Sequence, residues 1–168
     1  MRIRPYVNSD WQSVLEICLL AFAPIHESFA TLLGNELFRL VYPDWKASHE
    51  KYLQSLCDTE TEKDRPFVVE ESGVVVGFIH YEVNPDGQSG KIGLNAVHPA
   101  HQCKGVGTMM YGHVLDLMRT AGTKYAQVGT GGDPSHIPAR RAYEKLGFAP
   151  LPTGPVLQKT IEFGADRN

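Results

Sequence analysis

Cysteine is scarce in the 168-residue sequence, and its three cysteines, Cys18, Cys57 and Cys103, lie far apart. An odd number of cysteines with no C-x-x-C pair argues against a disulfide framework and against a zinc site. Unpaired thiols are typical of a reducing compartment. We therefore expect a cytoplasmic protein that binds no metal.

Long apolar runs and an excess of positive charge are also missing. The apolar stretches are too short to span a bilayer, and the N-terminal residues do not have the pattern of a signal peptide. The formal net charge is -3, whereas nucleic-acid-binding domains are usually basic. We expect neither a membrane nor a nucleic acid as partner. The length suggests one domain over 1–168, with the core at about 1–163 and a frayed tail over 164–168.

The hydrophobic pattern changes its period along the chain, which predicts blocks of helices and strands. Pro24 is expected to end the first helix, and Gly34 to interrupt the second. The order of the elements predicts an α/β protein with a mixed sheet and helices on both faces. The expected strands cover 3–7, 66–71, 74–83, 92–98, 124–130 and 155–163, and the expected helices cover 11–22, 29–42, 45–57, 105–121 and 138–146.

The segment 97–108 predicts a phosphate-binding turn between a strand and a helix that begins near Gly105. The first backbone N–H groups of a helix have no partner within the helix and, with the helix dipole, attract anions. Gly105 and Gly107 carry no Cβ, so an oxyanion can approach their backbone closely. Lys104 adds a positive charge, and Gln102 adds an amide donor.

Three other interpretations of the glycines compete with this one. The first is an ordinary strand–helix connection. The second is a dinucleotide-binding fingerprint, in which Met110 occupies the position of the third glycine. The third takes Gly129 to Gly132 as the loop of a nucleotide or S-adenosylmethionine site, but the preceding strand carries Gln127 where an acidic residue is usual.

A second motif, Pro-Ala-Arg-Arg-Ala-Tyr-Glu-Lys-Leu-Gly-Phe, spans residues 138–148. Alone it indicates an amphipathic helix that stops at a glycine. Together with Gln102-x-x-Gly105-x-Gly107 it resembles the motifs of the GNAT superfamily of N-acetyltransferases, in the same order and separation. The resemblance covers residues 1–165 and implies the GNAT acyl-CoA N-acyltransferase fold, a mixed and mostly antiparallel sheet with one splayed strand pair and helices on both faces.

The resemblance also implies an enzyme that uses acetyl-CoA as co-substrate and no metal. Acetyl-CoA would lie in a V-shaped gap, where the strand that ends at Val97 splays from the strand over 124–130. The acceptor amine would attack the thioester directly in a ternary complex, and the backbone N–H of Val97 would stabilise the oxyanion. Tyr143 stands where family members place the general acid for the leaving thiolate, a role that suits a phenol. The residues expected to bind acetyl-CoA are Ala96, Val97, Gln102, Cys103, Lys104, Gly105, Val106, Gly107, Thr108, His136 and Arg140.

Two positions depart from the family pattern. His136 replaces an asparagine that often contacts the CoA arm, and a histidine can still donate or accept a hydrogen bond there. Lys91 stands where some members have a glutamate base, so another base or an ordered water must take the amine proton. His80 and Glu82, on one face of a strand, are the base candidates, and Asp133 lies near the mouth of the gap. Each of these three residues also has a structural or solvated interpretation.

In this family the acceptor pocket forms largely from the segments that correspond to 23–29 and 151–156. Within the first segment, His26 and Glu27 are the candidate acceptor residues, because an acidic side chain attracts a cationic amine. Three nearby aromatic residues form either an apolar wall or part of the core, namely Phe38, Tyr42 and Trp45.

We expect the acceptor to be the amine of a small molecule, and the alternative is the N-terminus or a lysine of a protein or peptide. Two other function classes stay open. One is a CoA-binding regulatory module without turnover, and the other is a nucleotide- or S-adenosylmethionine-dependent enzyme. A homodimer also stays open.

Overall fold

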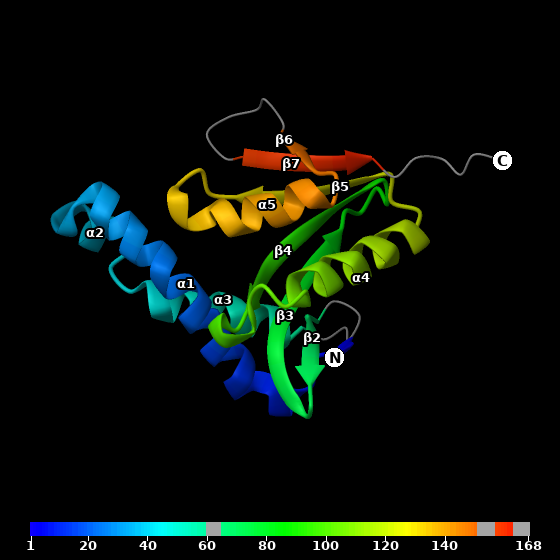
Figure 1. Cartoon of the computed structure of the whole chain (residues 1–168), viewed down its shortest axis with the longest axis horizontal. Coiled ribbons are helices and arrows are strands. Elements are labelled where there is room, and N and C mark those ends of the chain that lie inside the picture. Colours follow the sequence, from blue (N-terminus) through cyan, green and yellow to red (C-terminus); the bar gives the residue numbers. More distant parts are fainter. Residues whose placement is uncertain (60–64, 151–156, 163–168) are drawn as a thin grey trace.

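The computed structural model describes residues 1–59, 65–150 and, for the backbone only, 157–162. Most of the predicted connection over 59–65, the acceptor segment 151–156 and the predicted tail lie outside these residues. A seven-stranded sheet of order β1-β2-β3-β4-β5-β7-β6 forms the centre of the molecule (Figure 1). Its strands are β1 (Arg2–Pro5), β2 (Phe67–Glu71), β3 (Val74–Val83), β4 (Ser89–Val97), β5 (Tyr125–Thr130), β6 (Ala149–Pro150) and β7 (Leu157–Glu162).

The sheet splays between β4 and β5, its only parallel pair among the described strands. Pairing runs from Ser89 opposite Tyr125 to Ile92 opposite Val128. Beyond that point β4 continues to Val97 without pairing to β5, and Figure 1 shows the two strands diverging. The mixed, mostly antiparallel sheet with one splayed pair is thereby confirmed.

Helices cover both faces of the sheet, as predicted. One face carries α4 (Val106–Thr120) and α5 (Ile137–Lys145), and the other carries α1 (Trp11–Leu33) and α3 (Trp45–Cys57), while α2 (Asn35–Val41) follows α1 (Figure 1). Each face therefore has its own hydrophobic core. The α4 face buries Val76, Ile79, Met110, Val114, Tyr143 and Phe148, and the α1 face buries Val14, Ile17, Cys18, Leu53 and Phe78.

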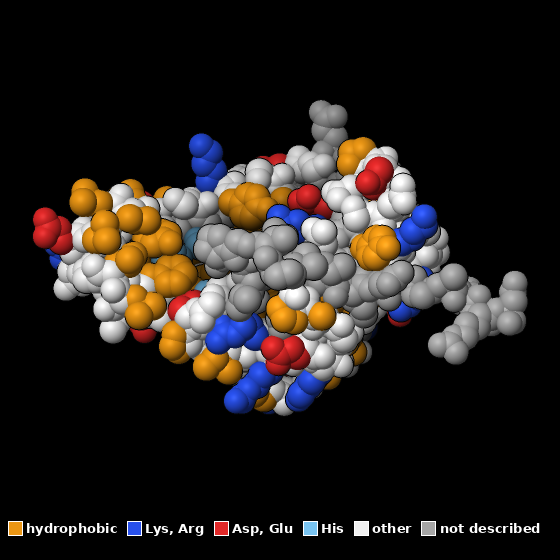
Figure 2. Space-filling view, turned by 90° about the horizontal axis from the view of Figure 1, so that it is seen from above, with side chains coloured by type: hydrophobic (Ala, Val, Ile, Leu, Met, Phe, Trp, Pro, Cys, Tyr) orange, Lys and Arg blue, Asp and Glu red, His pale blue; other side chains and the backbone are white. Residues whose placement is uncertain are grey.

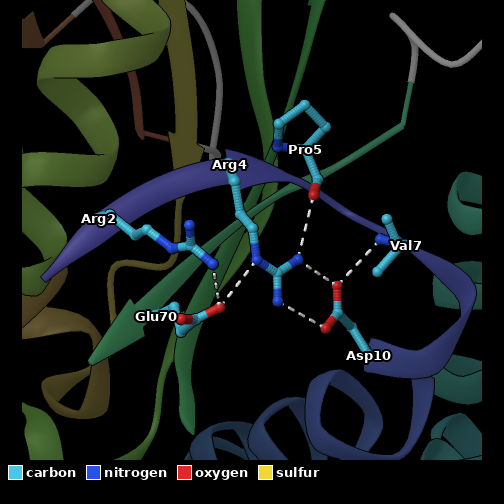
Figure 3. Close-up of polar contacts among 6 residues, drawn as sticks. All are labelled: Arg2, Arg4, Pro5, Val7, Asp10 and Glu70. Carbon is cyan, nitrogen blue, oxygen red and sulfur yellow. Dashed lines mark hydrogen bonds and ion pairs between the residues drawn. The ribbon is translucent and has the colours of Figure 1, made fainter. Parts of the chain in front are cut away.

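Arg4 joins the first strand to the start of the first helix and to β2 (Figure 3). Its guanidinium donates to both carboxylate oxygens of Asp10, at 2.7 and 2.9 Å, and to Glu70 at 3.0 Å. The backbone N–H of Val7 adds a third hydrogen bond to Asp10, at 2.9 Å. Burial alone would raise the pKa of Asp10, but the hydrogen bonds from Arg4 and Val7 outweigh it and lower this pKa.

The prediction that Pro24 ends the first helix is wrong, because α1 runs through it to Leu33. A proline inside a helix removes one backbone hydrogen bond and costs about 3 kcal/mol. Residues on both sides of Pro24 are buried in α1, including Cys18 and His26, and their packing offsets that cost. The chain turns instead at Gly34, whose φ of 75 ends α1 before α2 begins.

Two elements, α3 and β3, have the predicted bounds, whereas the two-residue strand β6 is too short to leave a periodic pattern. The expectation that every apolar stretch is too short to span a bilayer is wrong for Asn8–Leu33, which is long and apolar enough to cross a membrane by length and composition. Here it packs on the sheet, with Val14, Ile17 and Cys18 in the core.

Candidate active site at the splayed strands

The chain leaves β4 through a tight turn that leads into α4. A short 3-10 helix, η3 (Pro99–His101), precedes two residues in left-handed backbone conformation, Cys103 at φ 61 and Gly105 at φ 85. Glycine adopts this conformation without strain, whereas a side chain makes it unfavourable. A strained residue persists only where its surroundings fix the backbone, as is common at ligand sites.

Two side chains hold the turn in place. The Gln102 amide donates to the carbonyl of Val97 at 3.2 Å, and the Lys104 ammonium donates to the carbonyl of Ala100 at 2.8 Å. Both side chains therefore lie against the turn, on the path between β4 and α4. Cys103 is exposed at the same turn.

The first turn of α4 presents free backbone donors. No described residue accepts a hydrogen bond from the N–H groups of Gly105, Val106, Gly107 or Thr108, and the helical pattern begins with Met109, which donates to the carbonyl of Gly105. Unpaired N–H groups at the positive end of a 15-residue helix are an anion-binding arrangement. A Cβ at Gly107 would meet only the Tyr111 ring, at an ordinary 3.5 Å, so packing within the chain does not demand glycine there.

The backbone amide of Val97 faces the gap between β4 and β5. The N–H of His98 donates to the carbonyl of Val76 on β3 at 2.9 Å. Hydrogen-bonded and non-hydrogen-bonded pairs alternate along antiparallel strands, so the amide of Val97, opposite Gly77, faces away from β3. The carbonyl of Ala96 lies instead on the β3 side, 3.2 Å from the Cβ position of Gly77. Val97 is therefore the better placed of the two backbone candidates.

Tyr143 is buried on α5 and reaches a residue of β4 that lies beyond the paired part of the strands. Its hydroxyl lies 3.5 Å from the amide nitrogen of Asn95, and the Asn95 oxygen accepts a hydrogen bond from Tyr111 at 2.9 Å. The two tyrosine rings lie 5.1 Å apart. Burial raises the pKa of the Tyr143 phenol, and its contacts with Tyr111 and Asn95 lower it only partway. The phenol therefore keeps its proton at neutral pH.

Sequence reasoning did not predict Asn95 and Tyr111 as neighbours of Tyr143. Asn95 and Tyr143 are 48 residues apart in the chain. One signal was available, since Asn95 is a polar residue between the apolar residues Leu94 and Ala96, two positions before Val97.

The loop after β5 forms a polar cluster around Asp133. This carboxylate accepts hydrogen bonds from the hydroxyl of Ser28 at 3.1 Å, from the backbone and hydroxyl of Ser135, and from Nδ1 of His136. Arg140 donates to the backbone carbonyl of Asp133 at 2.9 Å. Burial would raise the pKa of Asp133, but the hydrogen bonds from Ser135 and His136 hold it at about 2. Asp133 is therefore ionised at neutral pH.

The two base candidates on β3 differ in position. Glu82 lies where β4 and β5 are still paired, and His80 lies at the start of the gap between them. Glu82 is opposite Lys91, within the stretch where β4 still pairs with β5, and its side chain is half exposed. His80 is buried, with Nδ1 3.9 Å from the Glu82 carboxylate. A Cβ at Gly93 would lie 2.8 Å from Nδ1 of His80, so glycine is required where β4 bulges past this ring.

His26, predicted as an acceptor residue, is the centre of an aromatic cluster formed by α1, α2 and α3. Its ring stacks on Trp45 at 4.2 Å. Burial, with a smaller contribution from His49, lowers the pKa of His26 to about 4. Its Nδ1 is buried without a hydrogen-bond partner among the described residues, whereas Glu27 is exposed. The remaining rings around His26 are Phe29, Phe38, Tyr42 and His49.

Apolar side chains also gather on the surface beyond this cluster. Figure 2 shows them at the end of the molecule where α2 lies. They belong to the end of α1 and to α2, and they are Leu32, Leu33, Leu37, Leu40 and Val41. No three metal-ligating side chains come together within 1–59 and 65–150.

A single family model covers both the turn before α4 and the motif of α5. The model of the family described as Acetyltransferase (GNAT) family matches residues 34–148, which include the turn before α4 and all of α5. No curated protein matches the sequence.

Solved structures share the fold over nearly the whole chain. PaiA N-acetyltransferase from Thermoplasma acidophilum, in complex with coenzyme A, is 15% identical with a TM-score of 0.73, and the match covers 96% of this chain and 98% of that one. The ribosomal-protein-S18-alanine N-acetyltransferase from Escherichia coli is 19% identical with a TM-score of 0.68, covering 99% and 97%. A GNAT family acetyltransferase from Brucella melitensis, in complex with acetyl-CoA, is 20% identical with a TM-score of 0.58, covering 99% and 90%.

Proposed function

The chain belongs to the GNAT family of acetyltransferases, and we propose that it transfers the acetyl group of acetyl-CoA to the primary amine of a small molecule. The observation that carries this proposal is the set of unpartnered N–H groups from Gly105 to Thr108 at the start of α4. A pyrophosphate needs such donors, and Lys104 beside them adds a charge. Two structural relatives hold CoA or acetyl-CoA, which supports the same ligand here.

The gap between β4 and β5 supports the chemistry proposed for this ligand. The N–H of Val97, turned away from β3, would stabilise the oxyanion that forms when an amine attacks the thioester carbonyl. Tyr143, protonated at neutral pH, would donate its proton to the departing thiolate. A phenol can do this because its pKa exceeds that of a thiol.

The acceptor would enter from the side covered by α1. Ser28 of α1 donates to Asp133 of the loop after β5, so this helix closes over one flank of the gap. Such closure favours a small acceptor over an extended peptide. Exposed Glu27, one residue earlier, would attract an ammonium group.

An acetyl-transfer screen tests the proposal. Wild-type protein would be incubated with acetyl-CoA and a panel of polyamines, amino acids, amino sugars and peptides with free N-termini or a free lysine, and the released thiol would be measured. We expect turnover with at least one small amine. Turnover confined to peptides would contradict the acceptor class. Binding of acetyl-CoA without transfer to any amine would point to a regulatory module.

Ligand-dependent melting separates the nucleotide alternatives. Acetyl-CoA should raise the melting temperature, because a ligand that binds only the folded state stabilises it by mass action. S-adenosylmethionine and NAD should leave it unchanged. Stabilisation by either of these two ligands, with none by acetyl-CoA, would contradict the assignment of the α4 turn.

A further inference from the structure

His136 and Asp133 form a pair of a histidine and a carboxylate in the loop after β5, at the open end of the gap. His136 ends η4 (Pro134–His136), directly before α5 and just after β5. Its Nδ1 bonds Asp133, and its side chain is 16% exposed. Histidine and aspartate in this arrangement are a familiar way of orienting an imidazole as a base.

The hydrogen bond to Asp133 determines which ring nitrogen can accept a proton. Ionised Asp133 accepts only, so Nδ1 of His136 carries the hydrogen. In the neutral ring, Nε2 then has a free lone pair. None of the described residues hydrogen bonds with Nε2, which leaves this nitrogen available to a substrate.

The carboxylate is itself fixed from several directions. Ser28 comes from α1, Ser135 from η4, and Arg140 from α5, where its guanidinium donates to the carbonyls of Gly131 and Asp133 at 2.7 and 2.9 Å. A Cβ at Gly131 would lie 2.7 Å from the Asp133 carboxylate, so glycine is needed beside the pair. Such support holds the imidazole in one orientation.

The ring of His136 lies against α1, the helix on the proposed acceptor side. It stacks on Phe29 of α1, with ring centroids 6.2 Å apart. His136 stands directly before the first residue of α5, the helix that also carries Tyr143.

We propose that Nε2 of His136, oriented by Asp133, is the general base that deprotonates the acceptor amine. This inference rests on the proposed acetyl transfer. It gives His136 a role other than the CoA contact that the sequence pattern predicts. Phe29 and Ser28 are the neighbours from α1, and the charged groups that face the ring are Asp133 and Arg140.

Every proton that moves in the proposed reaction has a donor and an acceptor. Nε2 takes one proton from the ammonium form of the acceptor and passes it to water. The freed lone pair forms the C–N bond as the carbonyl π pair moves onto oxygen, and the C–S bond breaks when that pair returns. The thiolate takes the proton of Tyr143, and the proton lost by the newly acylated nitrogen restores the phenol. The products are the amide, the free thiol of CoA and one proton in water.

His136→Asn is the informative variant, because its amide can keep the hydrogen bond to Asp133 while it removes Nε2. With an alkylamine acceptor, kcat/KM for the amine should fall by about 10²-fold at neutral pH. The dissociation constant of acetyl-CoA, measured by calorimetry, should stay within about twofold. His113→Asn on α4, whose ring lies against Phe67, is the matched control and should keep wild-type kinetics.

Two further readouts separate a base from a structural residue. With a hydrazide, whose nitrogen is already neutral at pH 7, His136→Asn should lose little activity, because no proton has to be removed before attack. With the alkylamine, log kcat/KM of the variant should rise by about one per pH unit between pH 7 and 9, because only the free amine reacts, while the wild type, which has a base for the ammonium proton, should rise less steeply.

Three results would overturn the inference. Wild-type kcat/KM in His136→Asn would show that no base acts from this position. A weaker affinity for acetyl-CoA with unchanged kcat would show a CoA contact. Equal losses for the alkylamine and the hydrazide would show a structural role. If the wild type itself acetylates no amine, the proposed function fails first, and the base fails with it.

Discussion

The amide nitrogen of Asn95 lies 3.5 Å from the hydroxyl of Tyr143, which connects a residue of the splayed strand to the proposed acid on α5. The same asparagine accepts a hydrogen bond from Tyr111 of α4. Three elements thus meet at the phenol, and its position depends on all of them.

Tyr143→Phe deletes a hydroxyl and almost no volume, so the fold and the affinity for acetyl-CoA should survive. Loss of a positioned acid should lower kcat by on the order of 10²–10⁴. The loss should be smaller for thioesters with a more acidic leaving thiol, because that thiolate departs without a proton. Rates per active site, measured beside a thermal melt, check this. Near-normal turnover in the folded fraction would mean that Tyr143 is a packing residue.

Asn95→Ala should reduce both stability and rate. It leaves the buried Tyr111 hydroxyl without its acceptor, which costs about 1–3 kcal/mol of unfolding free energy. The rate should fall less than in Tyr143→Phe, because the acid is still present but less well held. Denaturant unfolding and kcat, measured on the same preparation, test this. A rate loss as large as that of Tyr143→Phe would give Asn95 a direct part in the chemistry.

The sequence predicts the local parts of this site better than its long-range contacts. The turn at Gly105 and the helix with Tyr143 follow from short patterns, and α3 and β3 have their predicted bounds. The contact between Ser28 and Asp133 joins residues 105 positions apart, so no local pattern encodes it. Pro24 shows a different kind of error. Proline usually ends a helix, but α1 continues through Pro24 because the residues on both sides of it are packed in the protein.

Stability should depend on pH through His26. Burial lowers the pKa of His26 to about 4, whereas an unfolded histidine titrates near 6.5. Between these values the unfolded chain binds a proton that the folded chain does not, so stability falls as pH falls from about 6.5 and no further below about 4. From pH 7.5 to 5.5 this residue should cost about 1 kcal/mol. His26→Phe should flatten that part of the profile, and an unchanged slope would contradict the buried neutral ring.

Lys104 offers a salt-sensitive test of the phosphate turn. Its ammonium is exposed beside the free N–H groups of α4, so Lys104→Ala should weaken binding of acetyl-CoA by about 1 kcal/mol at low salt. The loss should shrink in high salt, because exposed charges are screened. Lys124→Ala, at the residue directly before β5, is the control with the same change of net charge. Equal effects of the two variants would remove Lys104 from the site.

The most direct measurement compares Gly107→Asp with Gly107→Asn by calorimetric titration with acetyl-CoA. The two side chains have nearly the same shape, and a Cβ at this position meets only Tyr111, at 3.5 Å, so both variants should fold. The aspartate places a negative charge at the donors proposed for the pyrophosphate, and the asparagine does not. We predict that both variants bind acetyl-CoA more weakly than the wild type, because a side chain hinders the close approach of the oxyanion, and that Gly107→Asp loses far more affinity than Gly107→Asn. Equal binding by the two variants would contradict the placement of the pyrophosphate at the start of α4, and with it the account of the site.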